Sequence, residues 1–139
     1  MNILEVLTKR RITGNIGEDA VRRLLRRKKY KISAKNYVAE NNEIDIVAEN
    51  KTHLCFVEVK TRTIGHEHPN EPRPASSVTP EKQRKIIAAA REYMSFNYTV
   101  KRIRFDVAEV WVDENGKVQS INYIENAFTR DTAYKRKYD

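Results

Sequence analysis

Hydrophobic residues recur at helical spacing in two segments of the chain. In the first, over about residues 15–29, apolar side chains lie three or four positions apart, and arginines and lysines fill the remaining positions. The second begins at Thr79-Pro80-Glu81, which supplies a capping hydroxyl, a proline at the first helical position and an acid at the positive end of the helix dipole. We therefore predict an amphipathic helix over residues 15–29 and another from Thr79 to about Met94.

Other segments are rich in the β-branched and aromatic residues that strands favour. They cover about residues 30–38, 43–48, 54–59, 103–112 and 118–124. Asn115-Gly116 is a strong hairpin-turn signal, residues 61–78 predict a proline-rich loop, and the basic tail 129–139 is expected to be mobile. This order predicts an α/β protein of the mixed α+β kind, αβββαββ, with a central mixed sheet of about five strands flanked by helices. A chain of 139 residues fits one such domain, with its core over about residues 12–128.

Charge narrows the range of partners. Lysine and arginine number 27 against 19 aspartates and glutamates, and the net charge of +8 favours polyanions, above all nucleic acid. A protein that is merely basic, or one that docks on an acidic membrane or ribosomal surface, would share this charge. No apolar run approaches the roughly 20 residues of a membrane span, and residues 1–7 lack the features of a signal peptide. With Cys55 as its only cysteine, the chain is expected in the reducing cytoplasm, without a membrane partner.

Two carboxylates and a lysine stand out on the predicted hairpin of residues 43–59. Because side chains alternate along a strand, Glu58 and Lys60 share one face of theirs. A turn with an even number of residues places Asp45 on the same face of the sheet, with Asp45 opposite Phe56 and Glu43 opposite Glu58. Asp45 and Glu58 are then diagonal neighbours, roughly 5–8 Å apart at Cβ. An odd turn would place them on opposite faces and remove the site.

Two carboxylates this close stay ionised only if a cation lies between them, and all-oxygen ligation suits Mg²⁺. The backbone carbonyl of Val59 is a candidate for a further ligand. Lys60 would orient the attacking water or offset charge in the transition state of phosphodiester hydrolysis. The alternative is a cross-strand ladder of ion pairs on a solvated face. The apolar run Phe56-Val57-Glu58-Val59 argues against it, because charges that emerge from a buried strand are costly when unpaired.

One residue from each predicted helix borders the apolar stripe and is a candidate for the same site. Glu18 lies beside the stripe of the first helix, although an acid that serves the helix dipole or pairs with Arg22 would fit there too. Lys82 lies at the apolar border of the second helix, where a phosphate-binding role competes with a lysine that only covers the core edge.

Taken in order, these pieces resemble a known family over about residues 12–128. The pieces are Gly17-Glu18, Glu43-Ile44-Asp45, Phe56-Val57-Glu58-Val59-Lys60-Thr61-Arg62, Lys82 and Arg104-Phe105-Asp106. The chain resembles the YraN-like family of uncharacterised bacterial proteins, distant relatives of archaeal Holliday junction resolvases in the PD-(D/E)XK nuclease superfamily. One departure is Ile44, which stands where the superfamily motif has proline. For Asp106 we find no catalytic reason and expect an ion pair with Arg104 or Arg62 at the sheet edge.

The resemblance implies a restriction-endonuclease-like core and a metal-dependent endonuclease that hydrolyses DNA, with branched or junction DNA as a candidate substrate. The sequence leaves open RNA in place of DNA, and a flap, nick or end in place of a junction. Mg²⁺ is the implied cofactor, with Mn²⁺ as a substitute, and symmetric cleavage of a junction would require a homodimer. The implied site comprises catalytic Glu18, Asp45, Glu58 and Lys60, the metal ligands Asp45, Glu58 and Val59, and the supporting residues Glu43, Arg62, Lys82 and Gln83. Two alternatives stay open: a nuclease fold that binds nucleic acid without cutting it, and an adaptor that docks on a ribosome or another protein.

Overall fold

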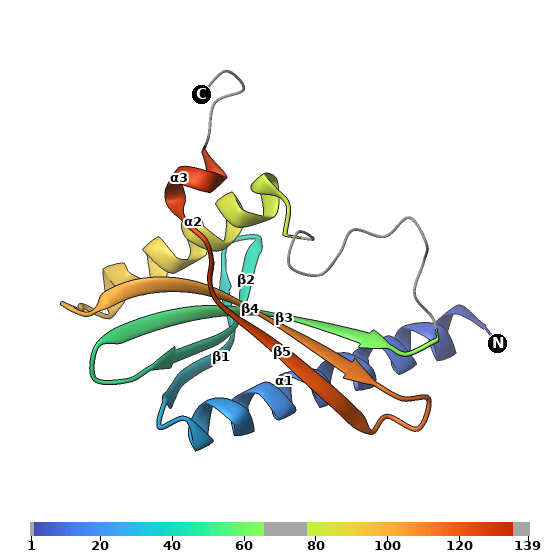
Figure 1. Cartoon of the computed structure of the whole chain (residues 1–139). Coiled ribbons are helices and arrows are strands. Elements are labelled where there is room, and N and C mark those ends of the chain that lie inside the picture. The colour runs from blue at the N-terminus through green and yellow to red at the C-terminus, as the bar shows by residue number, and fades with distance from the viewer. Residues whose placement is uncertain (1, 66–77, 135–139) are drawn as a thin grey trace.

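The computed structural model describes residues 2–65 and 78–134 and shows a five-stranded sheet between two long helices (Figure 1). The elements are α1 (Ile3–Arg27), β1 (Lys31–Ala39), β2 (Asn42–Glu49), β3 (His53–Thr63), α2 (Pro80–Phe96), β4 (Arg102–Val112), β5 (Val118–Phe128) and α3 (Arg130–Ala133). The predicted order and the mixed α+β class are confirmed.

The sheet has the order β1-β2-β3-β4-β5, in which only β3 and β4 run parallel. The connection between these two strands includes α2, which lies on one face of the sheet, while α1 lies on the other (Figure 1). Val21 and Leu25 of α1 pack with Ile46 and Val57, and α2 covers Phe56 on the opposite face. Alternation along the strands therefore divides the core into two layers and sends each face of β3 to a different helix.

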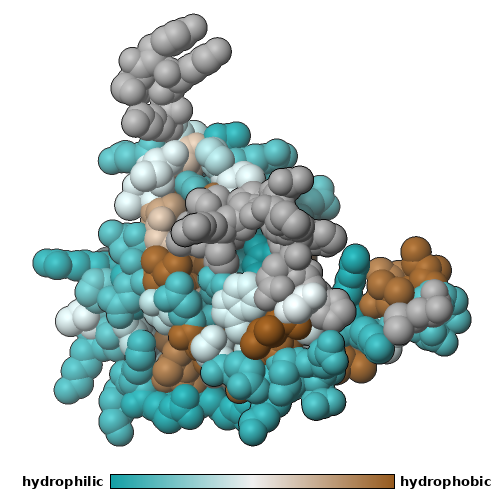
Figure 2. Space-filling model, turned by 45° about the vertical axis from the view of Figure 1, so that its right-hand side comes forward, coloured by the Kyte–Doolittle hydropathy of each residue, from teal (hydrophilic) through white to brown (hydrophobic). Residues whose placement is uncertain are grey.

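Helix α1 begins at Ile3, twelve residues before the predicted start. Asn2 caps it, with its Oδ1 accepting from the Glu5 N–H at 2.9 Å. The helical periodicity extends upstream through Ile3, Leu4 and Leu7, which are 52–74% exposed. This end of α1 extends beyond the sheet (Figure 1), and Figure 2 shows a group of hydrophobic side chains at the right-hand edge of the molecule. Even so, no helix in the described part of the chain is long and apolar enough to cross a membrane.

The chain end also differs from the prediction. A mobile tail is predicted from residue 129, but Thr129 caps the short helix α3, and its Ala133 is 1% exposed. The Arg84 side chain of α2 donates to the Ala133 carbonyl at 2.8 Å and ties α3 to α2. The prediction is therefore wrong for residues 129–134. Residues 135–139 lie outside the described residues, as do residues 66–77 of the predicted loop.

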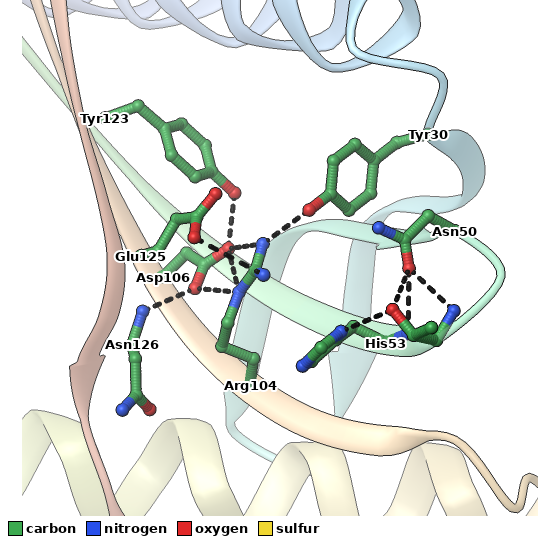
Figure 3. A network of polar contacts seen from close by, with 9 residues as sticks. Tyr30, Asn50, His53, Arg104, Asp106, Tyr123, Glu125 and Asn126 are labelled. Atoms are coloured by element: carbon green, nitrogen blue, oxygen red, sulfur yellow. Dashed lines mark hydrogen bonds and ion pairs between the residues drawn. The ribbon is translucent and has the colours of Figure 1, made fainter.

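A buried network of charged and hydroxyl groups joins β4 and β5 to the end of α1 (Figure 3). Arg104 Nε donates to Asp106 Oδ1 at 2.9 Å, and Arg104 Nη2 donates to the Tyr30 hydroxyl at 2.7 Å. Asp106, which is fully buried, also accepts from the Tyr123 hydroxyl at 2.6 Å and the Asn126 N–H at 2.9 Å. The predicted ion pair with Arg104 is confirmed, although it lies inside the sheet and not at its edge. Its charges satisfy one another, as a structural role requires.

Candidate active site

The site begins where the pairing of β2 with β3 ends. From the turn, the strands pair from Glu49 and Leu54 as far as Ile46 and Val57, which form the last pair. The sequence predicts Asp45 opposite Phe56, whereas the structure pairs Phe56 with Val47, so the predicted register is wrong by two residues.

The turn explains the shift. Asn50 Oδ1 accepts from the N–H groups of Thr52 at 3.0 Å and His53 at 2.8 Å, which closes an Asx turn one residue later than expected. The turn still has an even number of residues, so Asp45 and Glu58 keep the same face. Continuing the register places these two carboxylates directly opposite one another, closer than the predicted diagonal pair.

Beyond Ile46 and Val57 the two strands part. Asp45 replaces the backbone of β2 as hydrogen-bond partner, because its Oδ2 accepts the Val59 N–H at 2.7 Å. From this point β3 is paired with β4 alone, while the first residues of β2 pair only with β1 (Figure 1). The sheet thus opens next to Asp45 and Glu58, between a helix on each face.

The two carboxylates lie in a poorly solvated environment. Glu58 is 8% exposed, and burial, followed by the charge of Asp45, raises its pKa to about 7. Burial also raises the pKa of Asp45, and the hydrogen bond from Val59 opposes that rise. Both pKa values are raised because the two acids lie on strands whose neighbouring residues are buried. The pair therefore carries less negative charge near neutral pH than two free carboxylates would.

Two lysines face this pair from different elements. Lys60 Nζ of β3 lies 4.0 Å from Glu58 Oε1, at the outer limit of an ion pair. Lys82 comes from the first turn of α2, which begins with the predicted Thr79 cap. The charges of both lysines oppose the rise in pKa of Asp45 and Glu58. The structure thus brings Asp45, Glu58, Lys60 and Lys82 together, and their roles as metal ligands and catalytic groups stay predictions.

Glu18 of α1 reaches the same opening from the other face of the sheet. Burial raises its pKa first, and the charge of Asp45 raises it further. The side-chain amide of Asn36, with its nitrogen turned toward these acids, donates to Glu18 Oε2 at 3.2 Å and Glu43 Oε1 at 3.1 Å. Sequence reasoning missed Asn36. Its signal was a polar residue that disfavours strands in the middle of one, and it adopts a left-handed backbone, φ 49°.

Gly17 allows α1 to approach β3 beside the site. A Cβ at this position would overlap the Thr61 hydroxyl and lie 3.0 Å from Thr61 Cβ and 3.1 Å from its Cγ2. Only glycine therefore fits between the helix and the strand, and the close contact brings Glu18 next to the residues that follow Glu58.

We expect Gly17→Ala to lower the free energy of unfolding by about 1–3 kcal/mol, because the added methyl group forces the helix off the strand. Gly14→Ala is the matched control. It lies on the same helix, where a Cβ would meet nothing within 4 Å, and should stabilise by about 0.5–1 kcal/mol through helix propensity. Urea unfolding measures both. Equal stabilisation by the two substitutions would show that the contact with Thr61 does not restrict the helix.

The remaining predicted residues lie in other contacts. Gln83 donates to the Val78 carbonyl at 2.9 Å and accepts from the Thr132 hydroxyl at 3.2 Å, so its amide joins α2 to α3. Arg62 lies near Glu109 of β4, whose burial-raised pKa it opposes. Val59 enters the site through its N–H, and its carbonyl stays a predicted ligand. A role for these three groups in the site stays a prediction.

The donor set fits a hydrated divalent cation. Across residues 2–65 and 78–134, no three His, Cys, Asp or Glu side chains gather closely enough to form a metal site by themselves. Mg²⁺ does not require such a group, since it binds through one or two carboxylates and completes its shell with water and substrate phosphate. Asp45 and Glu58 supply two oxygen ligands, and Glu18 and Glu43 add negative charge beside Asp45, which Lys60, Lys82 and Arg22 offset in part. A basic protein thus holds an acidic centre that would attract a cation.

The raised pKa of Glu58 makes stability depend on pH. Its folded pKa of about 7 exceeds the usual 4.5, so its contribution is undiminished below pH 4.5 and is lost as pH rises toward 7. Glu58→Gln, which mimics the neutral form, should therefore be neutral near pH 4.5 and stabilising by about 2–3 kcal/mol at pH 8 without metal. Urea unfolding in EDTA at the two pH values tests this, and equal effects at both would contradict it.

Residues 17–110, which include all the residues of this site, match the model of the uncharacterised protein family UPF0102. The chain belongs to the UPF0102 family. A UPF0102 protein of Caldanaerobacter subterraneus is 37% identical over 121 residues, 86% of this chain and 96% of the relative. UPF0102 proteins of Prosthecochloris aestuarii and Desulfosudis oleivorans are 41% and 40% identical and cover 83% and 92% of this chain, and 91% and 98% of their own lengths. Membership of UPF0102 confirms the resemblance to YraN-like proteins, but these names state no reaction.

Proposed function

We propose that this UPF0102 protein is a metal-dependent endonuclease that hydrolyses phosphodiester bonds in DNA. One observation carries the proposal: Glu58, 8% exposed, faces Asp45 where the sheet opens, and within residues 2–65 and 78–134 its ion-pair partner is Lys60, 4.0 Å away. Buried carboxylates are costly unless a cation or a hydrogen-bond network compensates them. Among the described residues, the Val59 N–H compensates Asp45, whereas the hydrogen bond of Glu58 goes to Asp45 itself and brings no positive charge. A bound cation would compensate both carboxylates.

Within this mechanism each side chain has a distinct task. Asp45 and Glu58 would hold Mg²⁺, and when bound the ion supplies positive charge to the scissile phosphate and favours ionisation of water. The Val59 N–H fixes the orientation of the Asp45 carboxylate. Lys60, the cation nearest Glu58, orients the attacking water and offsets charge that develops on the phosphate oxygens.

Glu18 and Lys82 complete the site from the two helices. Lys82, whose charge acts on both Asp45 and Glu58, would bind the phosphate on the α2 side. Glu18 acts on Asp45 from α1 through its charge, and it shares the Asn36 side-chain amide with Glu43. It would thereby help to position Asp45. The excess of basic residues, +8 overall, attracts the DNA backbone, and the cytoplasm is the compartment we propose for the reaction.

A panel of labelled DNA substrates tests the proposal. Duplex, single-stranded, flap and four-way junction DNA would be incubated with the full chain in Mg²⁺ or Mn²⁺, with EDTA as the matched control. We expect cleavage of at least one substrate that EDTA abolishes. No cleavage of any substrate with either metal would contradict the proposal. DNA binding with an unchanged salt dependence in the presence and absence of metal would then favour a nuclease fold that only binds.

A further inference from the structure

Three large apolar side chains are exposed to solvent at and just after the C-terminal end of α2. Phe96 is 78% exposed, Tyr98 is 90% exposed and Val100 is 85% exposed. We call Phe96, Tyr98 and Val100 the aromatic patch. They alternate along the segment that leads from α2 into β4 and form the most exposed group of large apolar residues in the described part of the chain.

Local hydrogen bonds hold the segment that carries the patch. Asn97 Nδ2 donates to the Tyr93 carbonyl at 2.9 Å, and Thr99 Oγ1 accepts from the Lys101 N–H at 3.0 Å. The two aromatic rings, by contrast, contact no other ring in residues 2–65 and 78–134. Fully burying a side chain of this size contributes about 1.5–3 kcal/mol, and the isolated chain gains this from neither ring. A held segment with exposed rings is what a preformed binding surface requires.

Exposed basic side chains lie at the end of the sheet that follows the patch in the chain. Lys31, Lys51 and Arg102 are exposed, and we call them the basic rim. Arg102 adjoins the β2–β3 turn, since its N–H donates to the Thr52 carbonyl at 3.0 Å, and Lys31 pairs across the sheet with Glu49. The acid Glu49 also lies here, and Lys101 Nζ pairs with it at 2.7 Å. This end of the sheet therefore carries exposed positive charge next to the segment that holds the aromatic patch.

Such a combination fits unpaired nucleotides. Aromatic side chains stack on the faces of bases, and basic residues bind the phosphates that connect them. A protein partner would also bury apolar rings, but the three exposed cations next to this segment, with Glu49 already paired to Lys101, favour a polyanion. Duplex DNA keeps its bases stacked on one another and offers the rings no base face. The complementary partner is therefore a single-stranded segment.

We propose that the aromatic patch and basic rim bind single-stranded DNA, so that the substrate carries unpaired nucleotides beside the cleaved strand. This inference rests on the proposed function in taking DNA as the ligand. The patch and the site occupy the two ends of α2: Lys82 lies in its first turn and Phe96 is its last residue. At 1.5 Å per residue they lie about 21 Å apart, which corresponds to about six steps of a stacked strand at 3.4 Å each. One strand can thus contact both.

Fluorescence anisotropy with a labelled oligothymidine and with a blunt duplex tests the proposal. Both ligands are titrated in EDTA, so that binding is measured without cleavage. Phe96→Ala/Tyr98→Ala should weaken oligothymidine binding by about 10- to 100-fold and change duplex binding less than twofold. The slope of log K against log salt should stay unchanged, because these side chains bind no phosphate. Lys51→Ala/Arg102→Ala should instead reduce the magnitude of that slope by about 0.7 for each phosphate that the variant no longer binds.

Leu4→Ala/Leu7→Ala is the matched control, because it removes exposed apolar side chains, 72% and 52% exposed, from the far end of α1. It should bind oligothymidine like the wild type, and Tyr98→Phe should retain binding because it keeps the ring. If Phe96→Ala/Tyr98→Ala binds oligothymidine as tightly as the wild type, the proposal is overturned. This holds whether or not the wild type self-associates in sedimentation. That result is distinct from failure of the proposed function, which is read from cleavage in Mg²⁺ and not from binding in EDTA.

Discussion

Replacing Glu58 by alanine is expected to lower metal-dependent DNA cleavage by at least about 1,000-fold, equivalent to about 4 kcal/mol of transition-state stabilisation. The loss follows from removal of one of two carboxylates in a site where, among the described residues, no third acid takes its place as a direct ligand. Glu58→Gln should be equally inactive, since the amide keeps the shape but lacks the charge. Single-turnover cleavage in saturating Mg²⁺ measures the effect, because product release then does not limit the rate.

Glu92→Gln is the control for the loss of a carboxylate. Glu92 lies on α2, where it accepts from the Tyr37 hydroxyl at 3.1 Å, outside the site. We expect its cleavage rate to stay within about threefold of the wild type. Cleavage by Glu58→Ala above about one tenth of the wild-type rate would show that Glu58 does not hold the metal. The nuclease could then still be real, but its centre would lie elsewhere.

Replacing Asp106 by asparagine is expected to give the largest loss of stability, about 3–5 kcal/mol. The substitution leaves the Arg104 guanidinium, 9% exposed, without its bidentate partner and weakens the acceptor of the Tyr123 and Asn126 groups. A buried charge without its partner costs much more than the pair contributes to stability. Urea unfolding followed by circular dichroism would measure the change.

Glu125→Gln supplies the control on the same arginine. Glu125 Oε2 lies 3.7 Å from Arg104 Nη1, but its side chain is 58% exposed, so solvent screens the pair. Its loss should cost less than about 1 kcal/mol. If the two substitutions lower the free energy of unfolding equally, burial does not make the contacts of Asp106 in Figure 3 more stabilising than the exposed pair.

Comparison of the two charged clusters supports the assignment of function. Asp106 is fully buried and accepts from an arginine, a tyrosine and a backbone N–H, so its charge is compensated within the protein. Glu58 is nearly as buried, but its ion-pair partner is 4.0 Å away and its pKa is raised to about 7. One cluster stabilises the fold, and the other lowers its stability at neutral pH. Such a cost is typical of sites that must bind a ligand.

The sequence predicted the site through alternation and burial. Asp45 and Glu58 share a face for any even turn, so the prediction holds despite a register that was wrong by two residues. Glu18 and Lys82 were found because each borders an apolar stripe, and a border position on a helix lies where the buried face meets the polar face. The αβββαββ order followed from capping and turn signals that are local in the chain.

Features that depend on tertiary contacts were not predictable in this way. The exact register depends on the Asn50 side chain, which closes the turn through its own hydrogen bonds. Asn36 joins the site only because β1 lies next to β2 and its backbone is left-handed. The helix α3 forms where Arg84 and Gln83 of α2 bind it, 49 residues away in sequence. None of these partners can be identified from the periodicity of the segment itself.

Titration of Mn²⁺ into the metal-free protein at pH 7 tests the Asp45–Glu58 centre most directly. Calorimetry in two buffers of different ionisation enthalpy gives both the stoichiometry and the protons released. We expect one Mn²⁺ per chain and release of about half a proton, because Glu58 with a pKa of about 7 is half protonated before the metal binds. Asp45→Asn/Glu58→Gln should bind no Mn²⁺ at this site. The same stoichiometry and heat in this double variant as in the wild type would contradict the assignment.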